Sequence, residues 1–246
     1  MKEIQIRKND AGQRLDRFVG KAVPLLPESL LQKYIRLKRI KRNGKGAKRD
    51  VRLVEGDVLQ LYINDEFFER PTEENAWLKI ATPRLDIVYE DENILLADKK
   101  PGVLCHSAGE WSWDTLISNI QAYLRQSGEW DPKAENAFTP ALCNRIDRNT
   151  GGIVIAAKNA EALRILNDKI RDREIDKAYL CVVCGRPKPA EGRLEGYLFK
   201  DAVKNQVYVT KKPQPGAKSA ATEYRTLQSS RGLSLVECRL LTGRTH

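Results

Sequence analysis

The sequence predicts an α+β protein with a mainly antiparallel sheet, in which a small α/β domain precedes a larger, strand-rich domain. The first 63 residues combine two stretches of helical apolar spacing with short extended segments. Residues 64–84 are acidic and show little periodicity, which is typical of a linker. From residue 85 onward, strand patterns predominate with a few helices between them, and this mixture favours the α+β class.

The composition predicts a soluble globular protein. The 246 residues, 41% of them hydrophobic, are enough for one large domain or two modest ones. No run approaches the roughly 18 consecutive apolar residues of a membrane helix, so we expect no membrane partner. The first residues lack the apolar core of a signal peptide, so we expect a cytoplasmic protein.

Residues 1–63 are predicted to form the first domain. Its first helix has an apolar face and ends before Pro24. A second helix is predicted over residues 28–36. An extended segment then turns at Asn43-Gly44, and residues 59–63 alternate as a strand does.

A dense run of positive charge crosses the end of the second predicted helix and the following turn. The run extends from Arg36 to Arg52, and Asp50 is the single acid within it. A charge run is usually a solvated face, but so many like charges repel one another unless an anion lies among them. The net charge of +10 points the same way, so we expect this run to bind nucleic acid. The residues expected to make these contacts are Arg36, Lys38, Arg39, Lys41, Arg42, Lys45, Lys48 and Arg49.

The order of elements in this domain is similar to that of a small RNA-binding domain known from a small-subunit ribosomal protein. The resemblance covers roughly residues 12–63 and includes Arg14-Leu15-Asp16-Arg17 in the first helix. The segment Val54-Glu55-Gly56-Asp57 before the last strand also fits. This resemblance implies that structured RNA is the ligand.

Residues 85–246 are predicted to form the second domain. A helix is expected around residues 116–124, and a second helix is expected to begin after a cap at Asn159. The expected strands are 87–90, 94–97, 153–157, 177–184, 205–210, 221–227 and 234–241.

The polar loop around Asp147 runs directly into a buried strand and is the strongest local signal for chemistry. Asp147 lies close to Arg145 and Arg148, and their positive charge favours the ionised carboxylate. Two glycines at the end of the loop allow close approach of the backbone. An ionised carboxylate at a strand edge is a candidate nucleophile, whereas a structural Asp–Arg pair is the equally weighted alternative.

The run Asn144-Arg145-Ile146-Asp147-Arg148 resembles the active-site motif of the RluA-type RNA pseudouridine synthases. That motif has an Arg-Leu-Asp-Arg core followed by Thr, Gly and an apolar strand. Asn144 stands where the family usually has His, and Ile146 replaces Leu. Neither difference affects the carboxylate.

Three further segments follow in the order of this family. Residues 97–106 resemble its Asn-Lys-Pro-x-Gly motif with slightly altered spacing. Residues 177–185 resemble the strand that carries the active-site tyrosine, here Tyr179, and residues 241–246 resemble the Gly-Arg-Thr-His segment, with Arg244. In the family that last segment continues into further strands, so we expect this chain to be C-terminally incomplete.

The resemblance implies a pseudouridine synthase fold and the isomerisation of uridine to pseudouridine in RNA, by analogy in large-subunit ribosomal RNA. It implies no metal or other cofactor, and we expect a monomer. Asp147 would start the reaction, either by attacking the sugar or base or by removing a sugar proton. Arg244 would pair with Asp147, and Tyr179 would stack on the uracil. The residues expected to contact RNA in this domain are Lys99, Lys100, Arg145 and Arg148.

The main alternative is a non-enzymatic RNA-binding or ribosome-assembly protein, which would carry the same basic run without turnover. A DNA-binding regulator fits poorly, because no recognition helix with a dimer element is visible. Cys181 and Cys184 have metal-ligand spacing, but they lie in a predicted strand and should point to opposite faces, which disfavours a metal site.

Overall fold

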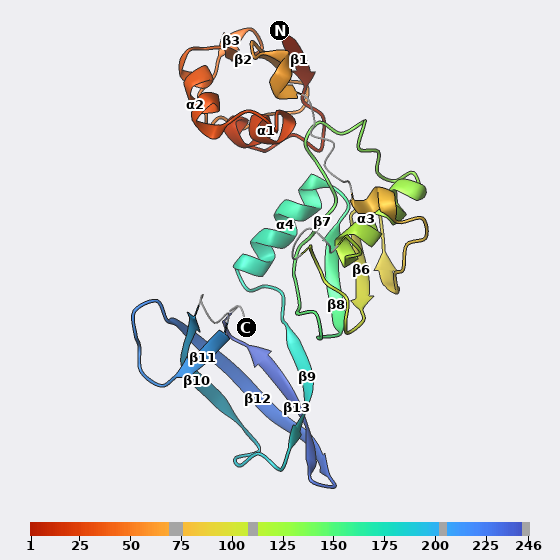
Figure 1. Cartoon of the computed structure of the whole chain (residues 1–246), viewed down its shortest axis with the longest axis vertical. Helices are drawn as coiled ribbons and strands as arrows, with labels where there is room; N and C mark the ends of the chain where they lie inside the picture. Colours follow the sequence, from red (N-terminus) through yellow and green to blue (C-terminus); the bar gives the residue numbers. More distant parts are fainter. Residues whose placement is uncertain (69–75, 108–112, 202–205, 243–246) are drawn as a thin grey trace. The chain divides into compact units, whose positions relative to one another are not determined.

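The computed structural model describes residues 1–68, 76–107, 113–201 and 206–242, which fall into two compact units, Met1–Asp172 and Arg173–His246 (Figure 1). Every strand pair in these residues is antiparallel, and four α-helices accompany three sheets. The predicted α+β class with a mainly antiparallel sheet is therefore confirmed.

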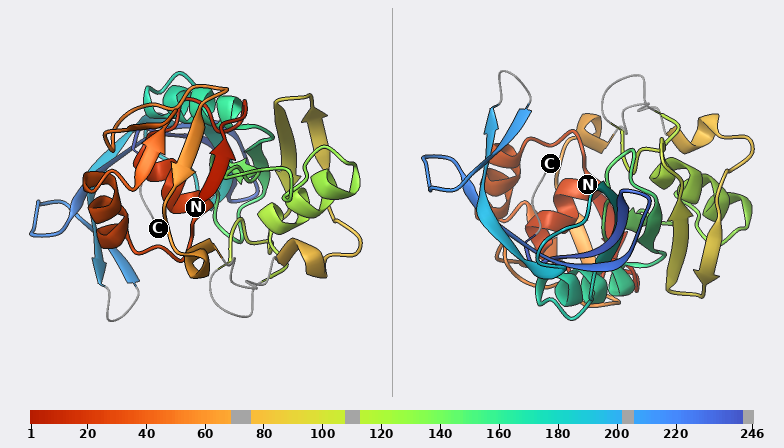
Figure 2. Two further views of the ribbon diagram at one scale, coloured as in Figure 1. Left: turned by 90° about the horizontal axis from the view of Figure 1, so that it is seen from above. Right: turned by 90° about the horizontal axis from the view of Figure 1, so that it is seen from below.

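The first sheet is covered by two helices, α1 (Leu15–Ala22) and α2 (Glu28–Arg36), whose apolar faces share one core with it (Figure 2). The strand order is β1-β4-β2-β3. Both helices form where the apolar spacing predicts them. The strands are β1 (Lys2–Gln5), β2 (Ile40–Arg42), β3 (Lys45–Gly46) and β4 (Val58–Leu61).

The predicted turn at Asn43-Gly44 joins β2 to β3. Both residues have positive φ, 51° and 79°, as the two-residue turn of a tight hairpin requires. Strand β1, in contrast, was not predicted. Only Ile4 among its four residues is apolar, and Lys2, Glu3 and Gln5 are exposed, so the segment has no alternating pattern of its own. The strand forms because β4 pairs with it.

Asp57 stabilises this hairpin through its buried carboxylate, and only 6% of the residue is exposed. Its carboxylate accepts hydrogen bonds from the Val54 backbone N–H and from Asn43 Nδ2, both at 2.8 Å, and pairs with Arg42 Nε at 2.6 Å. Burial by itself would raise the pKa of Asp57. The bonds from Val54, Arg42 and Asn43 outweigh that effect, so the pKa lies below its ordinary value of 3.8.

We expect acid to destabilise this domain through Asp57. A carboxyl with a lowered folded pKa contributes stability above its unfolded pKa, and that contribution is lost as pH falls through the folded value. The window therefore lies below about pH 3.8. Asp57→Asn should lower the free energy of unfolding at neutral pH by about 1–3 kcal/mol and flatten its fall in acid. Urea titrations of both proteins at several pH values measure this, and equal acid profiles would contradict it.

The second sheet has strand order β5-β6-β8-β7 and lies in the same unit. Asn159 caps α4 as predicted, because its side-chain oxygen accepts from the Ala162 N–H at 2.9 Å. The elements are β5 (Ile87–Glu90), β6 (Ile94–Lys99), α3 (Leu116–Gln126), β7 (Ala141–Leu142), β8 (Gly152–Ala157) and α4 (Ala160–Arg171).

The segment predicted as a linker, residues 64–84, contains two short 3-10 helices, η1 (Asp65–Phe68) and η2 (Ala76–Lys79). Trp77 of η2 is buried and meets Trp130 edge-on, with ring centroids 5.5 Å apart. The end of this segment therefore packs against Trp130, because burying an indole ring removes a large apolar area from water. Residues 69–75 lie outside the described residues.

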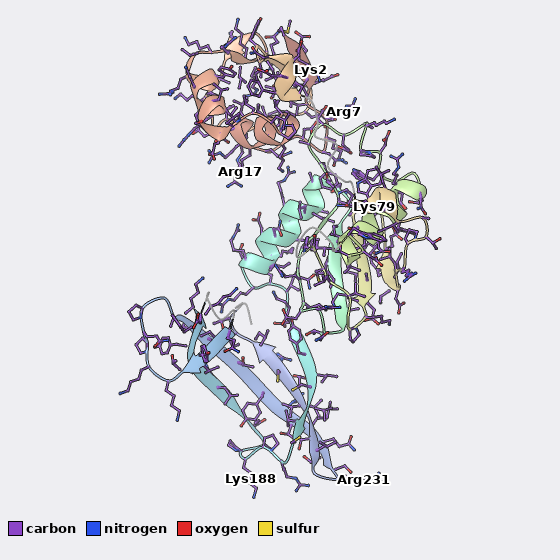
Figure 3. All side chains as sticks on the ribbon, viewed as in Figure 1. Lys2, Arg7, Arg17, Lys79, Lys188 and Arg231 are labelled. Carbon is purple, nitrogen blue, oxygen red and sulfur yellow. The ribbon has the colours of Figure 1, made fainter. Side chains whose placement is uncertain are left out.

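Polar contacts join the first domain to the rest of its unit. Asp10 is fully buried and accepts from Asn136 Nδ2 at 2.7 Å. Asn9 donates to Glu135 Oε1 at 2.7 Å, and Arg7, labelled in Figure 3, donates to the Ala134 carbonyl. These contacts join residues 7–10 to residues 134–136 within one compact unit.

The second unit is a five-stranded sheet with the order β11-β10-β12-β13-β9. Its described residues contain no helix. Lys188 and Arg231 mark one end of it (Figure 3). The strands are β9 (Ala178–Cys184), β10 (Glu191–Asp201), β11 (Gln206–Thr210), β12 (Lys218–Ser230) and β13 (Leu233–Leu240).

Strand β10 was not predicted, because its two glycines and three charged residues in the first six positions are poor strand formers. Packing against the neighbouring strand explains why one of these positions, Gly192, has no side chain. Gly192 lies opposite Tyr224, and a Cβ added there would come within 3.2 Å of the Tyr224 ring.

No helix among the described residues of the chain is long and apolar enough to cross a bilayer.

Candidate active site

Asp147 is exposed on the loop that joins β7 to β8. The residue before it, Ile146, is buried and anchors the loop from below. Asn144 fixes the start of the loop to β8, since its side-chain oxygen accepts from the Ile155 N–H at 2.8 Å and its amide donates to the Ile153 carbonyl at 3.3 Å. The carboxylate is therefore exposed to solvent on a loop that is fixed by the buried Ile146 and by the hydrogen bonds of Asn144 to β8.

Lys99, at the end of β6, clamps this loop to the neighbouring one. Its residue is only 1% exposed. Its ammonium donates to the carbonyls of Lys100 at 3.2 Å, Val103 at 2.9 Å and Arg148 at 3.0 Å. An ammonium has three N–H donors, so these three acceptors use all of them. The loops that carry Val103 and Arg148 therefore share one buried cation.

The electrostatics of Lys99 follow from this position. Burial lowers the pKa of Lys99 below its ordinary value, while the nearby Cys105 and Asp147 act in the opposite direction. The expectation that Lys99 contacts an RNA phosphate does not fit its burial. Nothing in a single sequence distinguishes a buried lysine from an exposed one, because the carbonyls that surround it come from residues as far away as Arg148.

Three more hydrogen bonds join the same pair of loops. Gly102 N–H donates to the Arg148 carbonyl at 2.8 Å, and Arg148 Nε donates to the Gly102 carbonyl at 3.1 Å. Cys105 Sγ donates to the Ile146 carbonyl at 3.3 Å. The Asp147 loop is thus attached to the preceding loop on both sides of the carboxylate.

The same close packing leaves little room for a side chain at Gly151. A Cβ at Gly151 would lie 3.2 Å from Pro101 Cδ, tighter than side chains normally tolerate. Gly152 has φ of 128°, in the region that favours glycine. The two glycines after Asp147 therefore allow the loop to pass against Pro101 and enter β8.

Lys100 is the exposed neighbour of Lys99. Its Nζ lies 2.7 Å from Asp86 Oδ2 and 2.7 Å from Asp98 Oδ2, and these bonds raise its pKa. An RNA phosphate at Lys100 would have to compete with two carboxylates.

Arg145 and Arg148 are exposed on either side of Asp147, as the sequence indicates. His106 lies near Arg145. Burial lowers the pKa of His106, and the positive charge of Arg145 lowers it further. The neutral imidazole is favoured beside this loop.

Tyr179 belongs to a different compact unit from Asp147. Tyr179 is half-buried on β9 in the second unit, where it pairs in register with Cys238 of β13. Arg244 lies outside the described residues. In the part of the chain that is described, no group of three or more His, Cys, Asp or Glu side chains is arranged to hold a metal ion.

The basic turn, which we define as residues 36–49, forms a second candidate surface. Lys45 and Lys48 line a shallow groove of about 570 Å³ around the hairpin turn. Arg39 lies over the Tyr34 ring at 4.6 Å, and Lys41 over the Tyr62 ring at 5.2 Å. Most of the predicted contact residues are exposed here, but Arg42 is engaged with Asp57.

The fold and this loop define a class of protein. The structure is similar to that of human RNA Pseudouridylate Synthase Domain Containing 4, with a TM-score of 0.54 over 70% of this chain and 65% of that one, at 21% sequence identity. It is also similar to human RNA Pseudouridylate Synthase Domain Containing 1, with a TM-score of 0.51 over 67% of this chain and 62% of that one, at 20% identity. These likenesses establish a pseudouridine synthase fold.

Sequence comparisons give the family. The family model for RNA pseudouridylate synthase matches residues 93–246. An uncharacterized RNA pseudouridine synthase of Mycoplasma genitalium is 32% identical over 98% of this chain and 74% of its own length. Ribosomal large subunit pseudouridine synthase C of Escherichia coli is 27% identical over 100% of this chain and 74% of its own length. The chain belongs to the RNA pseudouridylate synthase family and is an RNA pseudouridine synthase, as its motifs predict.

Proposed function

We propose that this chain converts uridines of large-subunit ribosomal RNA to pseudouridine, with Asp147 as the catalytic residue. The observation that carries the proposal is the exposed carboxylate on a loop that Asn144 and the buried Lys99 hold in place. A catalytic group must be held in a defined position and yet be open to its substrate, and this loop meets both demands.

Two facts support ribosomal RNA as the substrate. Relatives from Escherichia coli and Vibrio parahaemolyticus, 27% identical to this chain, are named ribosomal large subunit pseudouridine synthase C. The first domain carries a basic turn with exposed lysines around a groove, which suits a phosphate backbone. We infer that the protein works as a monomer in the cytoplasm, where its substrate is.

In the reaction the glycosidic bond to nitrogen 1 of the uracil breaks, the base turns over, and a bond forms from the sugar to carbon 5. Asp147 starts the reaction by attack on the sugar or base or by removal of a sugar proton. The family motif assigns Arg244 as the positive partner that keeps this carboxylate ionised. Tyr179 stacks on the uracil and assists the loss of the proton from carbon 5.

The target uridine must leave its stack to reach Asp147, at a cost of a few kcal/mol. Arg145 and Arg148 flank the carboxylate and contact the phosphates next to the extruded nucleotide. The basic turn adds contacts elsewhere on the RNA and raises its concentration at the loop.

The proposal is tested by tritium release from ribosomal RNA labelled at carbon 5 of uridine. The synthase releases tritium in proportion to the pseudouridine formed. A ribosome-assembly protein without turnover binds the same RNA and releases none. Measuring binding and release on one preparation separates the two functions.

The basic turn yields a prediction for affinity. Replacing Lys45, Lys48 and Arg49 together by Gln should weaken RNA binding roughly 10- to 100-fold and reduce the slope of log affinity against log salt by about two to three. The three side chains are exposed, so the fold should be retained. Filter binding at several salt concentrations measures both quantities.

A matched control removes the same charge from the second unit. It replaces Lys188, Lys212 and Arg231, which are also exposed, by Gln. Equal losses of affinity in the two triple variants would show that net charge, and not the basic turn, accounts for binding.

A further inference from the structure

Cys181 on β9 and Cys238 on β13 are free cysteines that have no role in the proposed reaction. The two strands are antiparallel, with Cys181 opposite Val236 and Cys238 opposite Tyr179. This register places both thiols on one face of the sheet, on a diagonal between neighbouring strands. Their Sγ atoms lie 3.8 Å apart, in contact.

The remaining cysteines are placed differently. Cys184 is exposed on the same strand as Cys181, but it lies opposite Leu233 and therefore on the other face. Cys105 is buried, and its thiol donates a hydrogen bond to the Ile146 carbonyl. Burial raises the pKa of the Cys143 thiol to about 11. Both belong to the first unit.

We propose that Cys181 and Cys238 are a site of reversible oxidation, at which a peroxide converts the two thiols into a disulfide that joins β9 to β13. The contact between the sulfurs carries this inference. Forming an S–S bond of about 2.0 Å requires both side chains to rotate and the two strands to move slightly closer at this diagonal. The proposal does not depend on the role of Asp147 or of Tyr179.

The reaction balances with hydrogen peroxide as the oxidant. The Cys181 thiolate attacks one peroxide oxygen, the O–O bond breaks, and the thiol becomes a sulfenic acid while one water is released. Cys238 then attacks the sulfur of Cys181, and the sulfenic oxygen leaves as a second water. Two thiols lose two protons and two electrons, and the peroxide takes up both.

The environment of each thiol assigns these roles. Cys181 is exposed, whereas Cys238 is half-buried. Burial raises the pKa of Cys238, and its neighbours Cys181 and Glu237 raise it further. The exposed thiol therefore meets the oxidant first, and the half-buried one resolves the sulfenic acid.

The bridge would lie directly beside Tyr179, because Cys238 is the cross-strand partner of that residue. Oxidation would fix the strand that carries Tyr179 to its neighbour. A dithiol reductant would return both strands to the original state.

The test uses the intact folded chain, treated with a small excess of hydrogen peroxide and then alkylated. We expect the loss of two of the five free thiols, without a covalent dimer on a non-reducing gel. Mass spectrometry should find a linked pair of tryptic peptides containing residues 178–193 and 232–239. Dithiothreitol should restore both thiols.

Cys181 and Cys184 fall in the same tryptic peptide, so variants complete the assignment. Cys184→Ser should form the bridge as the wild type does, whereas Cys181→Ser and Cys238→Ser should not. A bridge that persists in Cys181→Ser, a bridge lost in Cys184→Ser, or a wild type that keeps all its thiols or forms only dimers would overturn the proposal.

Discussion

Asp147→Asn should lower the rate of pseudouridine formation by at least about 10³-fold, as expected when a residue that acts directly on the substrate is lost. The amide has nearly the shape of the carboxylate but carries no charge and cannot act as nucleophile or base. Asp147 is exposed on its loop, so the fold should not change. RNA affinity should stay within about twofold of the wild type, since phosphate contacts dominate it. Tritium release and filter binding measure the two quantities.

Asp168→Asn is the matched control, because Asp168 is also an exposed carboxylate and lies on α4. It should leave tritium release unchanged. A catalytically competent Asp147→Asn protein would remove Asp147 from the reaction and leave the family assignment standing without its proposed catalytic residue.

Lys99→Met should have the largest effect on stability of any single substitution near this loop. Methionine fills the space but leaves the carbonyls of Lys100, Val103 and Arg148 without their donor. A buried acceptor left unpaired costs about 1–3 kcal/mol, so we expect a loss of about 3 kcal/mol or more in the free energy of unfolding. Urea unfolding followed by fluorescence measures it.

Lys100→Met provides the comparison. Lys100 is 60% exposed at its side chain and pairs with Asp86 and Asp98, which are also solvent-accessible. Surface ion pairs of this kind contribute about 1 kcal/mol or less. If the two methionine variants lost the same free energy of unfolding, the Lys99 clamp would contribute nothing beyond a surface contact.

The same pair of variants tests whether Lys99 positions the Asp147 loop. At a temperature where Lys99→Met remains folded, it should reduce kcat with little change in KM, because the loop that carries the carboxylate loses its anchor. Lys100→Met should retain kcat. A folded Lys99→Met protein with normal kcat would limit Lys99 to a role in stability.

Several elements of the fold are encoded locally and were therefore predictable. The apolar spacing of α1 and α2, the Asn43-Gly44 turn and the Asn159 cap depend on residues a few positions apart. The opposite faces of Cys181 and Cys184 follow from the alternation of any strand.

Other features depend on partners far along the chain. Strand β1 and strand β10 form because β4 and β12 lie beside them, although neither has a strong pattern of its own. Trp77 packs on Trp130 instead of serving as part of a spacer. In each case the tertiary neighbour outweighs the local preference.

The sequence by itself determined the α+β class, the basic turn, and the motifs around Asp147 that place the chain among the RNA pseudouridine synthases. Only the tertiary structure decided that Lys99 is buried while Lys100 is exposed, and that Cys181 contacts Cys238. The physical reason is that residue type and spacing act over short distances, whereas burial and contact depend on which distant carbonyls, rings and thiols the folded chain brings together.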